Sequence, residues 1–565
     1  MEATIAQSWD FTYSGARRWY VQLLPSLTDF AFLLPLFLMF VMLPGSQVLL
    51  RDGDTGWHIR TGEWIWQHKM VPTVDIFSFT KPHQPWFAWE WGWDVLFAVV
   101  NRFSGLAGVV FVNVVLLGFI SALLFRLIRR CSQSDGLAAF FTLLGICVSM
   151  THWLARPHLF SWVFVLIFLH VIASAEEGNG RRLYMLPLLT FFWTNLHGGF
   201  FIGIMLVASS AFAEALKALL WSEDAWRVAY KNSRPYLLSA LGCLAATFVN
   251  PYTWHLHQHI AAYLHDSKLL DNIQEFQSVN FHRASSIFFE AMLLLGVPAG
   301  FWCLRHGRIA HAVSILLWAH LALISARNTP IFVLIAAPWV AAMSLDFADR
   351  LGKVRWLKRL SAVASEISNE FRPLEKIERW HVVSATAVLC IAVLLGSKRP
   401  EFEAKFNPKS FPLQTVPALE SLKGLRVFAS DQWGDYLIYR FYPHQQVFMD
   451  GRSDFYGAGF VRTYQHIMSA QYDWESDLKR FGIDAVMVKP DAPIAAVLKE
   501  SRRWNTVFDN GSVIVFRAQP PLTGTSGSCV SAGTGPDARK KLGIFGSSQV
   551  YDGSSTLKFQ ERRSL

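Results

Sequence analysis

The residues best suited to chemistry stand close together near the start of the chain, between Arg51 and Thr80. Two carboxylates, Asp52 and Asp54, follow an apolar run that begins near Leu27, so they are expected at the face of a membrane. A carboxylate at that depth costs free energy unless it meets a cation, a polar ligand or water. With a histidine and an arginine beside them, these carboxylates indicate a reaction site that faces a lipid-borne substrate. An ordinary polar loop with an aromatic belt explains the neighbouring tryptophans, but it explains the acidic cluster less well.

The same loop continues to Asp94 and places further carboxylates among tryptophans, with Glu90 directly after Trp89. Aromatic faces with interspersed carboxylates are a common way to hold a sugar, whose C–H faces stack while its hydroxyls seek polar partners. A membrane-surface helix anchored by tryptophans explains those tryptophans equally well. The loop therefore predicts either a sugar-binding surface or an interfacial anchor.

Composition and charge place this loop in a membrane protein. Of the 565 residues only 17% are charged, and the chain contains 45 Phe and 23 Trp, which is typical of several membrane spans with an aromatic-rich interface. The net charge of +10 lies mainly in short basic segments between the apolar runs. That is the positive-inside pattern, which sets orientation and does not indicate nucleic acid as a partner. The six cysteines are scattered without a metal-binding spacing, so cysteine chemistry is excluded as the function.

Apolar runs of spanning length are expected to form the scaffold that positions the loop. They fall near 27–49, 105–125, 136–154, 158–175, 183–197, 199–220, 236–250, 286–304, 309–326, 328–345 and 381–396. By the roughly 20-residue length of a span, they predict a polytopic α-helical membrane protein with about eleven transmembrane helices. With the basic segments inside, residues 1–26 are cytoplasmic, the loop 51–94 is external, and the core 27–396 precedes an extracytoplasmic part.

Residues 397–518 have the composition of a small soluble domain. The segments LRVFAS, QQVFMD, DAVMVK and SVIVFRA predict strands, while DWESDLKRFG and APIAAVLKESRRW predict helices, which together indicate a C-terminal α/β domain. Asp450 and Arg452 directly follow one predicted strand, a usual binding position in α/β folds, although a salt-bridged turn is the alternative. Residues 519–565 are rich in Gly, Ser and Thr and are expected to be a disordered tail.

Several of these segments resemble the GT-C membrane glycosyltransferases, in particular the oligosaccharyltransferases and, more loosely, the protein mannosyltransferases. DGDTGWHIRTGEWI and VPTVDIFSFT are similar to the first external loop of that family. DNIQEFQSVNF is similar to a later external segment and puts Glu275 at its acidic position, while ASDQWGDYLIY resembles the acceptor-recognition motif through Trp433 and Asp435. The family's second acidic motif has no counterpart, because the corresponding turn, HWLARPHLFSW, offers Arg156 and His158.

The resemblance implies transfer of a sugar from a polyprenyl-phosphate carrier to an acceptor outside the cytoplasm. Asp52 or Asp54 would accept the acceptor's proton as general base. The leaving phosphate needs cationic stabilisation, for which the fork of an arginine is well suited. The candidates for this role are Arg60, Arg156, His158 and Arg327. Arg60 is equally well placed to form a structural ion pair with Glu63 or Asp54.

The resemblance also implies partners and a cofactor. The acceptor would be a glycan, a lipid or a protein, and the protein would lie among the lipids of a bacterial inner membrane, with no nucleic acid as partner. The acceptor or the sugar would be held by His58, Glu63, Trp89, Glu90, Trp433, Asp435, Asp450 and Arg452. A divalent cation, Mg²⁺ or Mn²⁺, could bridge Asp52, Asp54 and Glu275.

Two functions of other classes would leave a similar pattern in the sequence. One is a non-enzymatic transporter or flippase of lipid-linked saccharides, and the other is a membrane subunit that recruits a partner. A transporter is expected to carry charged residues near the middle of its spans. Here they gather at the outer ends, around 51–63, 156–158, 275 and 327, which favours chemistry at the membrane surface.

Overall fold

The computed structural model describes residues 19–221, 224–351, 378–397, 399–400, 402–413 and 420–519. The described residues up to Gln519 form one compact unit, which contains both a helical bundle and a small sheet. Residues 1–18 of the expected cytoplasmic segment 1–26, and all of the expected tail 519–565 except Gln519, lie outside the described residues.

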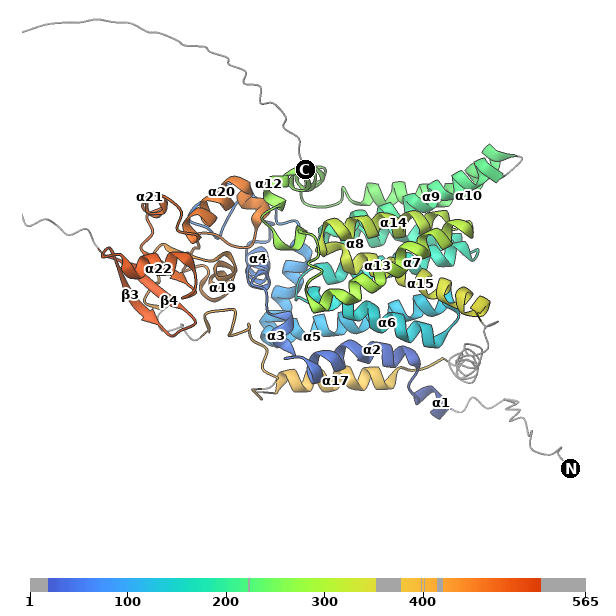
Figure 1. Ribbon diagram of the computed structural model, residues 1–565, viewed down its shortest axis with the longest axis horizontal. Helices are drawn as coiled ribbons and strands as arrows, with labels where there is room; N and C mark the ends of the chain where they lie inside the picture. Colours follow the sequence, from blue (N-terminus) through green and yellow to red (C-terminus); the bar gives the residue numbers. More distant parts are fainter. Residues whose placement is uncertain are drawn as a thin grey trace, which may run out of the picture. The chain divides into compact units, whose positions relative to one another are not determined.

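Helices lie over all of the apolar runs that were expected to span the membrane (Figure 1). They are α2 (Leu27–Phe37, continued by a π-helical turn, Leu38–Met42), α5 (Trp91–Ser132), α6 (Asp135–Ser149), α7 (His158–Glu176), α8 (Leu186–Leu196), α9 (Phe201–Trp221), α10 (Ala225–Ala246), α13 (Ile287–Arg305), α14 (Ile309–Ile324), α15 (Thr329–Leu351) and α17 (Val382–Gly396). Among the described residues, seven helical segments are long and apolar enough to cross a membrane, and α14 and α17 are shorter apolar helices. The chain is therefore a polytopic helical membrane protein.

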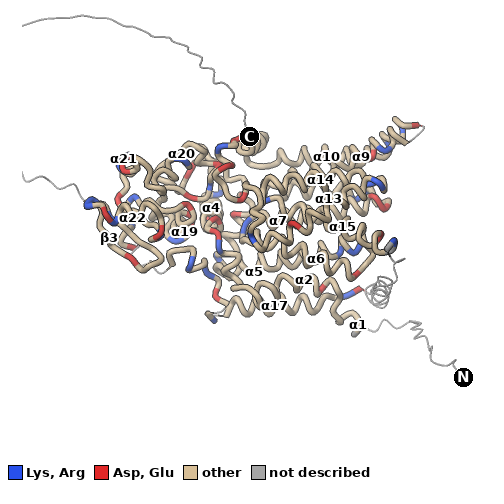
Figure 2. The backbone as a smooth tube through the Cα atoms, viewed as in Figure 1, with Lys and Arg blue, Asp and Glu red and all other residues tan. Residues whose placement is uncertain are grey.

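The charged residues of the bundle are distributed as the sequence predicts. Figure 2 shows Lys, Arg, Asp and Glu gathered toward the two ends of the helices, with middles that are largely uncharged. In α10 the first half is basic, with Arg227, Lys231 and Arg234, which explains why this 22-residue helix is not among the candidate spans although its second half is apolar.

Helix α5 begins earlier than the apolar run predicted. It starts at Trp91 and has 42 residues, with a kink at Gly105. Gly105 has a φ of +59°, a left-handed conformation that glycine adopts without steric cost. Residues 91–104 therefore form a separate helical segment that leads from the external loop into the bundle.

The loop that the sequence predicts to be external contains a helix, α4 (Asp54–His68), which packs between α5 and α19 (Asp431–Phe441). Two glycines permit this close packing. A Cβ added to Gly56 would lie 2.8 Å from the carbonyl oxygen of Asp435, and one added to Gly62 would lie 1.9 Å from that of Asp94. Short helices, α1 (Trp19–Leu23), α3 (Ser46–Leu49), α11 (His255–His265) and α12 (Ser267–Leu270), complete the part before the sheet.

The C-terminal part has a four-stranded sheet in the order β1-β2-β4-β3. Its strands are β1 (Val427–Ala429), β2 (Ala485–Val488), β3 (Trp504–Asp509) and β4 (Ile514–Ala518), and its remaining helices are α20 (Ser453–Met468), α21 (Trp474–Arg480) and α22 (Pro493–Glu500). β1 pairs with β2 in parallel, from Val427 opposite Ala485, while β4 is antiparallel to both β2 and β3. Helices stand between β1 and β2 and between β2 and β3, as predicted for this region, whereas β3 and β4 follow each other directly.

One predicted strand is absent from the sheet, and one strand of the sheet was not predicted. The segment QQVFMD forms no strand of this sheet, because Val447 makes an isolated bridge with Ser78 and exchanges backbone hydrogen bonds with Phe77 and Phe79. It is thus tied to the external loop. β3, in turn, was not expected, since most of its residues are exposed and polar ones such as Asn505 interrupt the apolar pattern.

One hydrophobic core joins the bundle to the C-terminal part. Trp433, Tyr436 and Leu437 of α19 are buried in the same cluster as the apolar residues of α4 and α5. This continuity fixes α19 against the external loop and so determines which polar groups meet between them.

Candidate active site

A cavity of about 1060 Å³ lies where five segments meet: the loop before α5, the turn before α7, the loop before α13, the turn between α14 and α15, and the C-terminal part. Each of these five segments contributes titratable side chains to its wall. They include Asp52, Asp54, His58, Glu90, Arg156, Glu275, Arg327 and Asp431. Side chains that are far apart in the sequence are therefore brought together at one end of the bundle.

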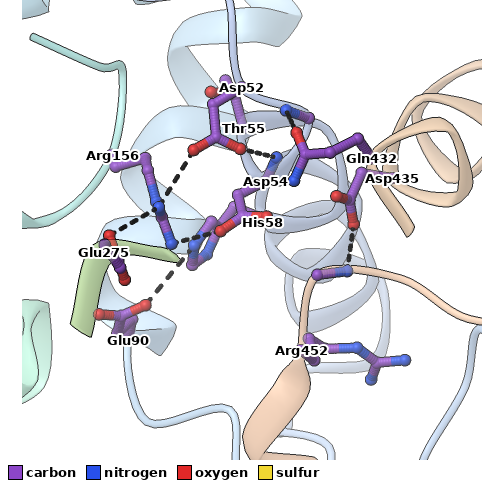
Figure 3. A network of polar contacts seen from close by, with 12 residues as sticks. Asp52, Asp54, Thr55, His58, Glu90, Arg156, Glu275, Gln432, Asp435 and Arg452 are labelled. Atoms are coloured by element: carbon purple, nitrogen blue, oxygen red, sulfur yellow. Dashed lines mark hydrogen bonds and ion pairs between the residues drawn. The ribbon is translucent and has the colours of Figure 1, made fainter. Parts of the chain in front are cut away.

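Arg156 stands at the centre of the acidic residues in this cavity (Figure 3). Its Nη1 lies 3.1 Å from Oδ2 of Asp52 and 3.7 Å from Oε2 of Glu275, while its Nη2 forms an ion pair with Oδ2 of Asp54. Glu275 has a second cationic partner, because Nη1 of Arg327 lies 3.3 Å from its Oε1. Three carboxylates and two guanidiniums thus form one continuous network.

Backbone contacts hold this network in place. The N–H of Ala155 donates to the carbonyl of Leu49 at 2.9 Å, and the hydroxyl of Thr55 donates to the carbonyl of Ala155 at the same distance. Pro157 follows Arg156 directly and caps α7, so the turn has little freedom. The start of α4 and the start of α7 are consequently locked together, which aims Arg156 at the carboxylates.

Burial and charge set the protonation of Asp54 and its neighbours. Burial raises the pKa of Asp54, Arg156 lowers it and Asp52 raises it, with a result of about 7. Burial and the nearby Asp54 hold the pKa of Asp435 well above its usual range, and its Oδ1 accepts a hydrogen bond from the N–H of Gly451 at 2.8 Å. The pKa of Asp435 is therefore shifted toward the protonated form, whereas Asp54 can gain or lose a proton near pH 7.

The pKa of Glu275 is shifted in the opposite direction. Burial raises its pKa, but Arg327 and Arg156, with the two histidines at 152 and 158, outweigh burial and lower the pKa to about 2. For Arg156, burial lowers the pKa, and the carboxylates of Asp54 and Asp52 raise it well above its usual range. Both groups therefore stay ionised.

Glu90, on another wall of the cavity, contacts two histidines, and Figure 3 shows its contact with His58. Its Oε2 is 3.5 Å from Nε2 of His58, whose Nδ1 is 2.6 Å from Oδ1 of Asp94, and its Oε1 is 3.5 Å from Nε2 of His197. Burial raises the pKa of Glu90 to about 8, although Arg156 and Arg327 lower it. Burial lowers the pKa of His58 well below its usual range. Glu90 is thus largely protonated at neutral pH and faces a neutral imidazole.

Several residues that the sequence singled out do not reach the cavity. Arg60 pairs with Glu63 and donates to the carbonyl of Tyr439, which is the structural alternative considered for it. Nε2 of His158 lies 2.8 Å from the carbonyl of His152. None of Arg60, Glu63 and His158 is among the residues that line the cavity.

The expected acceptor surface of the C-terminal part is also mostly closed. Trp433 is buried and donates from Nε1 to the carbonyl of Ser410 at 2.7 Å. Arg452 touches the cavity, but its side chain is 1% exposed and pairs with Asp450 and Asp75 at 2.7 Å each. The geometry of Asp450 and Arg452 therefore matches the salt-bridged turn, which was the alternative for this segment.

Other cavity residues carried no signal in the sequence. Gln432 accepts a hydrogen bond from the N–H of Gly53 at 2.9 Å and so joins α19 to the acidic loop. Tyr464 and Gln465 of α20 also line the wall. These three residues are isolated polar residues on helices. Only Gln432 could have been inferred from the sequence, because it stands beside Trp433.

The carboxylates do not form a ready metal site. Among the described residues, no group of three or more His, Cys, Asp and Glu side chains is arranged to hold a metal ion. Asp52, Asp54 and Glu275, the expected ligands, all face the guanidinium of Arg156. The acidic donors suit a divalent cation chemically, but a positively charged side chain stands among them, so the site does not fit one.

The helical bundle and the C-terminal part together have a fold similar to that of a solved oligosaccharyltransferase. The chain is similar to the crystal structure of the Archaeoglobus fulgidus oligosaccharyltransferase tethered with an acceptor peptide containing the NVT sequon via a disulfide bond. The TM-score is 0.51 and the identity 12%, over 83% of this chain and 69% of that chain. This confirms the GT-C resemblance at the level of the fold.

Two further structures of the archaeal enzyme are similar as well. Its apo form gives a TM-score of 0.47 at 12% identity, over 83% of this chain and 70% of that chain. AglB from the same organism, in complex with an inhibitory peptide and a dolichol-phosphate, gives 0.49 at 12% identity, over 82% and 69%. No family model and no curated protein matches the sequence.

Proposed function

We propose that this chain is a GT-C-type glycosyltransferase, which moves a sugar from a polyprenyl-phosphate carrier to an acceptor outside the cytoplasm. The observation that carries the proposal is the cavity at one end of an apolar bundle, where the carboxylates of Asp52 and Asp54 face Arg156, and where Glu275 joins Arg156 to Arg327. An acid-base group and cations at the edge of a membrane suit a phosphate leaving group that stays in the lipid. The oligosaccharyltransferase fold, solved with an acceptor peptide, supports the same reaction class.

The cations would hold the phosphate of the donor. Arg156 and Arg327 both line the cavity and are joined through Glu275, and their side chains are 22% and 35% exposed. Each guanidinium presents several N–H donors, so a phosphate can bind to the exposed edges of both. The negative charge that develops on the departing phosphate would then be stabilised by two fixed positive charges.

We assign the role of base to Asp52, with Asp54 beside it. The side chain of Asp52 is 15% exposed in the cavity, against 6% for Asp54, and its Oδ1 accepts a hydrogen bond from the N–H of Asp54 at 3.1 Å. In the reaction the acceptor's oxygen attacks the anomeric carbon, its proton passes to Asp52, and the bond from that carbon to the phosphate oxygen breaks. Asp54 would hold Arg156 in position.

The sugar and the acceptor would bind on the wall formed by His58, Trp89 and Glu90, all of which line the cavity. The ring of Trp89 offers a face for stacking, and the protonated Glu90 offers a hydrogen-bond donor. A peptide, a lipid or a glycan acceptor suits these groups.

The arrangement in the membrane belongs to the same proposal. We infer about eleven spans in residues 27–396, an extracytoplasmic domain in residues 397–518, and a cytoplasmic N-terminus in a bacterial inner membrane, since the basic segments then lie inside. A non-enzymatic transporter is less well supported, because charged residues gather at the helix ends (Figure 2).

The test is release of polyprenyl phosphate by the purified, reconstituted protein from a panel of polyprenyl-phosphate sugars. Wild type is expected to release it, and Asp52→Asn to abolish release. Asp271→Asn is the matched control, because this exposed carboxylate lies in the loop of Glu275 but does not line the cavity. Intact transfer in Asp52→Asn would contradict the assignment of the base to Asp52, and intact transfer in both Asp52→Asn and Asp54→Asn would contradict a base in this loop. Saturable binding of a donor without release would favour the transporter or the recruiting subunit.

A further inference from the structure

We infer that the guanidinium of Arg156 takes the place of a divalent cation among the carboxylates of the cavity, so that the site works without a bound metal ion. Asp52, Asp54 and Glu275 come from two segments and converge on this one side chain, from three directions. These are the oxygen ligands that Mg²⁺ or Mn²⁺ would use.

The geometry leaves no room for both cations. Mg²⁺ binds oxygen at about 2.0–2.1 Å, so an ion shared by the three carboxylates would have to lie where the guanidinium nitrogens are. Nη1 faces two of the carboxylates, at 3.1 Å and 3.7 Å, and Nη2 faces the third. A metal ion at this point would also meet the repulsion of a fixed positive charge at close range.

The charge of the cluster is already largely balanced. Arg156 and Arg327 supply two positive charges to Asp52, Asp54 and Glu275, and both arginines contact Glu275. Arg156 is also rigidly held, because the backbone of Ala155 is bonded on both sides to Leu49 and Thr55. The cation is therefore built into the fold at a fixed place, as a metal ion would be.

One part of this inference rests on the proposed function, namely that Arg156 receives the leaving phosphate in place of a metal ion. The metal-binding part can be tested without any sugar donor. The probe is Mn²⁺, whose binding to purified, metal-free protein is measured by electron paramagnetic resonance and by the shift of the thermal unfolding temperature.

Wild type is expected to bind no Mn²⁺ at Asp54. The Mn²⁺ signal of Asp54→Asn should therefore equal that of wild type. Arg156→Asp replaces the guanidinium with a carboxylate and is expected to gain a bound Mn²⁺ and a higher unfolding temperature in its presence. A second change, Glu275→Gln, should remove both gains. Arg156→Gln removes the charge without adding another carboxylate. It is expected to bind Mn²⁺ more weakly than Arg156→Asp does, and it replaces Arg156→Asp in the test if that variant does not fold.

Mn²⁺ bound by wild type and lost in Asp54→Asn would overturn the inference, as would folded Arg156→Asp and Arg156→Gln proteins that bind none. Where transfer is detected, a chelator is expected to leave it unchanged. Transfer that stops with the chelator and returns with Mn²⁺ would overturn the inference while supporting the glycosyltransferase. Absence of transfer would contradict the proposed function but leave the Mn²⁺ result to be judged on its own.

Discussion

Substitution of Arg156 by glutamine removes the cation that Asp52, Asp54 and Glu275 share. Loss of one preorganised donor to a developing negative charge lowers kcat by about 10²–10³, which corresponds to about 2.7–4 kcal/mol of transition-state stabilisation. We expect Arg156→Gln to lower kcat for release of polyprenyl phosphate by this factor. The assay is release from reconstituted vesicles at saturating donor, with the protein amount matched.

The same substitution affects stability by a smaller amount. The side chain of Asp54 is 6% exposed and loses its ion pair, and a buried polar group without a partner costs about 1–3 kcal/mol. Because the pKa of Asp54 is about 7 even with the arginine present, it takes up a proton once the arginine is gone, which limits the loss. We therefore expect a folded protein with a lowered unfolding temperature.

Arg156→Lys separates charge from shape. Nη1 faces Asp52 and Nη2 faces Asp54, and a single ammonium cannot reproduce both directions. An intermediate rate is expected. Arg227→Gln is the control, since this side chain on α10 is 85% exposed and remote from the cavity. A folded Arg156→Gln protein with the kcat of wild type would refute the role of this residue.

Three further predictions concern the walls of the cavity. The pKa of Glu90 is raised from 4.5 to about 8, so its stabilising contribution is complete below pH 4.5 and is lost as the pH rises through 8. Unfolding temperatures measured at pH 6 and pH 8 should therefore differ less in Glu90→Gln than in wild type. Gly62→Ala should destabilise the protein by about 1–3 kcal/mol, because its Cβ would meet the carbonyl of Asp94 at 1.9 Å. Gly136→Ala, with nothing within 4 Å, should show no such loss in the same thermal unfolding assay. Trp89→Ala should raise the KM for the donor or the acceptor about 2- to 10-fold, if the ring contributes about 0.5–1.5 kcal/mol by stacking; an unchanged KM for both would exclude it.

The helical bundle could be predicted from the sequence because its signal is local. A run of apolar residues long enough to span a membrane must satisfy its own backbone hydrogen bonds, and a helix does so. The start of α5 was missed because residues 91–104 are too mixed in polarity to resemble a span. The strands were less predictable, since Val447 pairs with Ser78, which lies far away in the sequence.

The types of residue in the site could be predicted from the sequence, but the ion pairs between them could not. Asp52, Asp54, His58 and Glu90 lie in one loop of unusual composition and all line the cavity. The choice between Arg60 and Arg156 as a cation could not be made from spacing. Arg60 turns to the face of α4 that carries Glu63, three residues along the helix. Such pairings follow from which helix face is covered, and that depends on α19, hundreds of residues away.

The way the cavity is assembled bears on when the protein can become active during its synthesis. Its walls include Asp52 in the first loop and Gln465 in α20, so most of the chain must be inserted and folded before they meet. Until α19 arrives, the face of α4 that carries Gly56 has no cover and Gly53 has no Gln432 to bond. A nascent or truncated chain that ends before α19 therefore carries the carboxylates and Arg156 without a closed site. For the proposed reaction, assembly of the complete cavity is therefore delayed until α19 and α20 have folded.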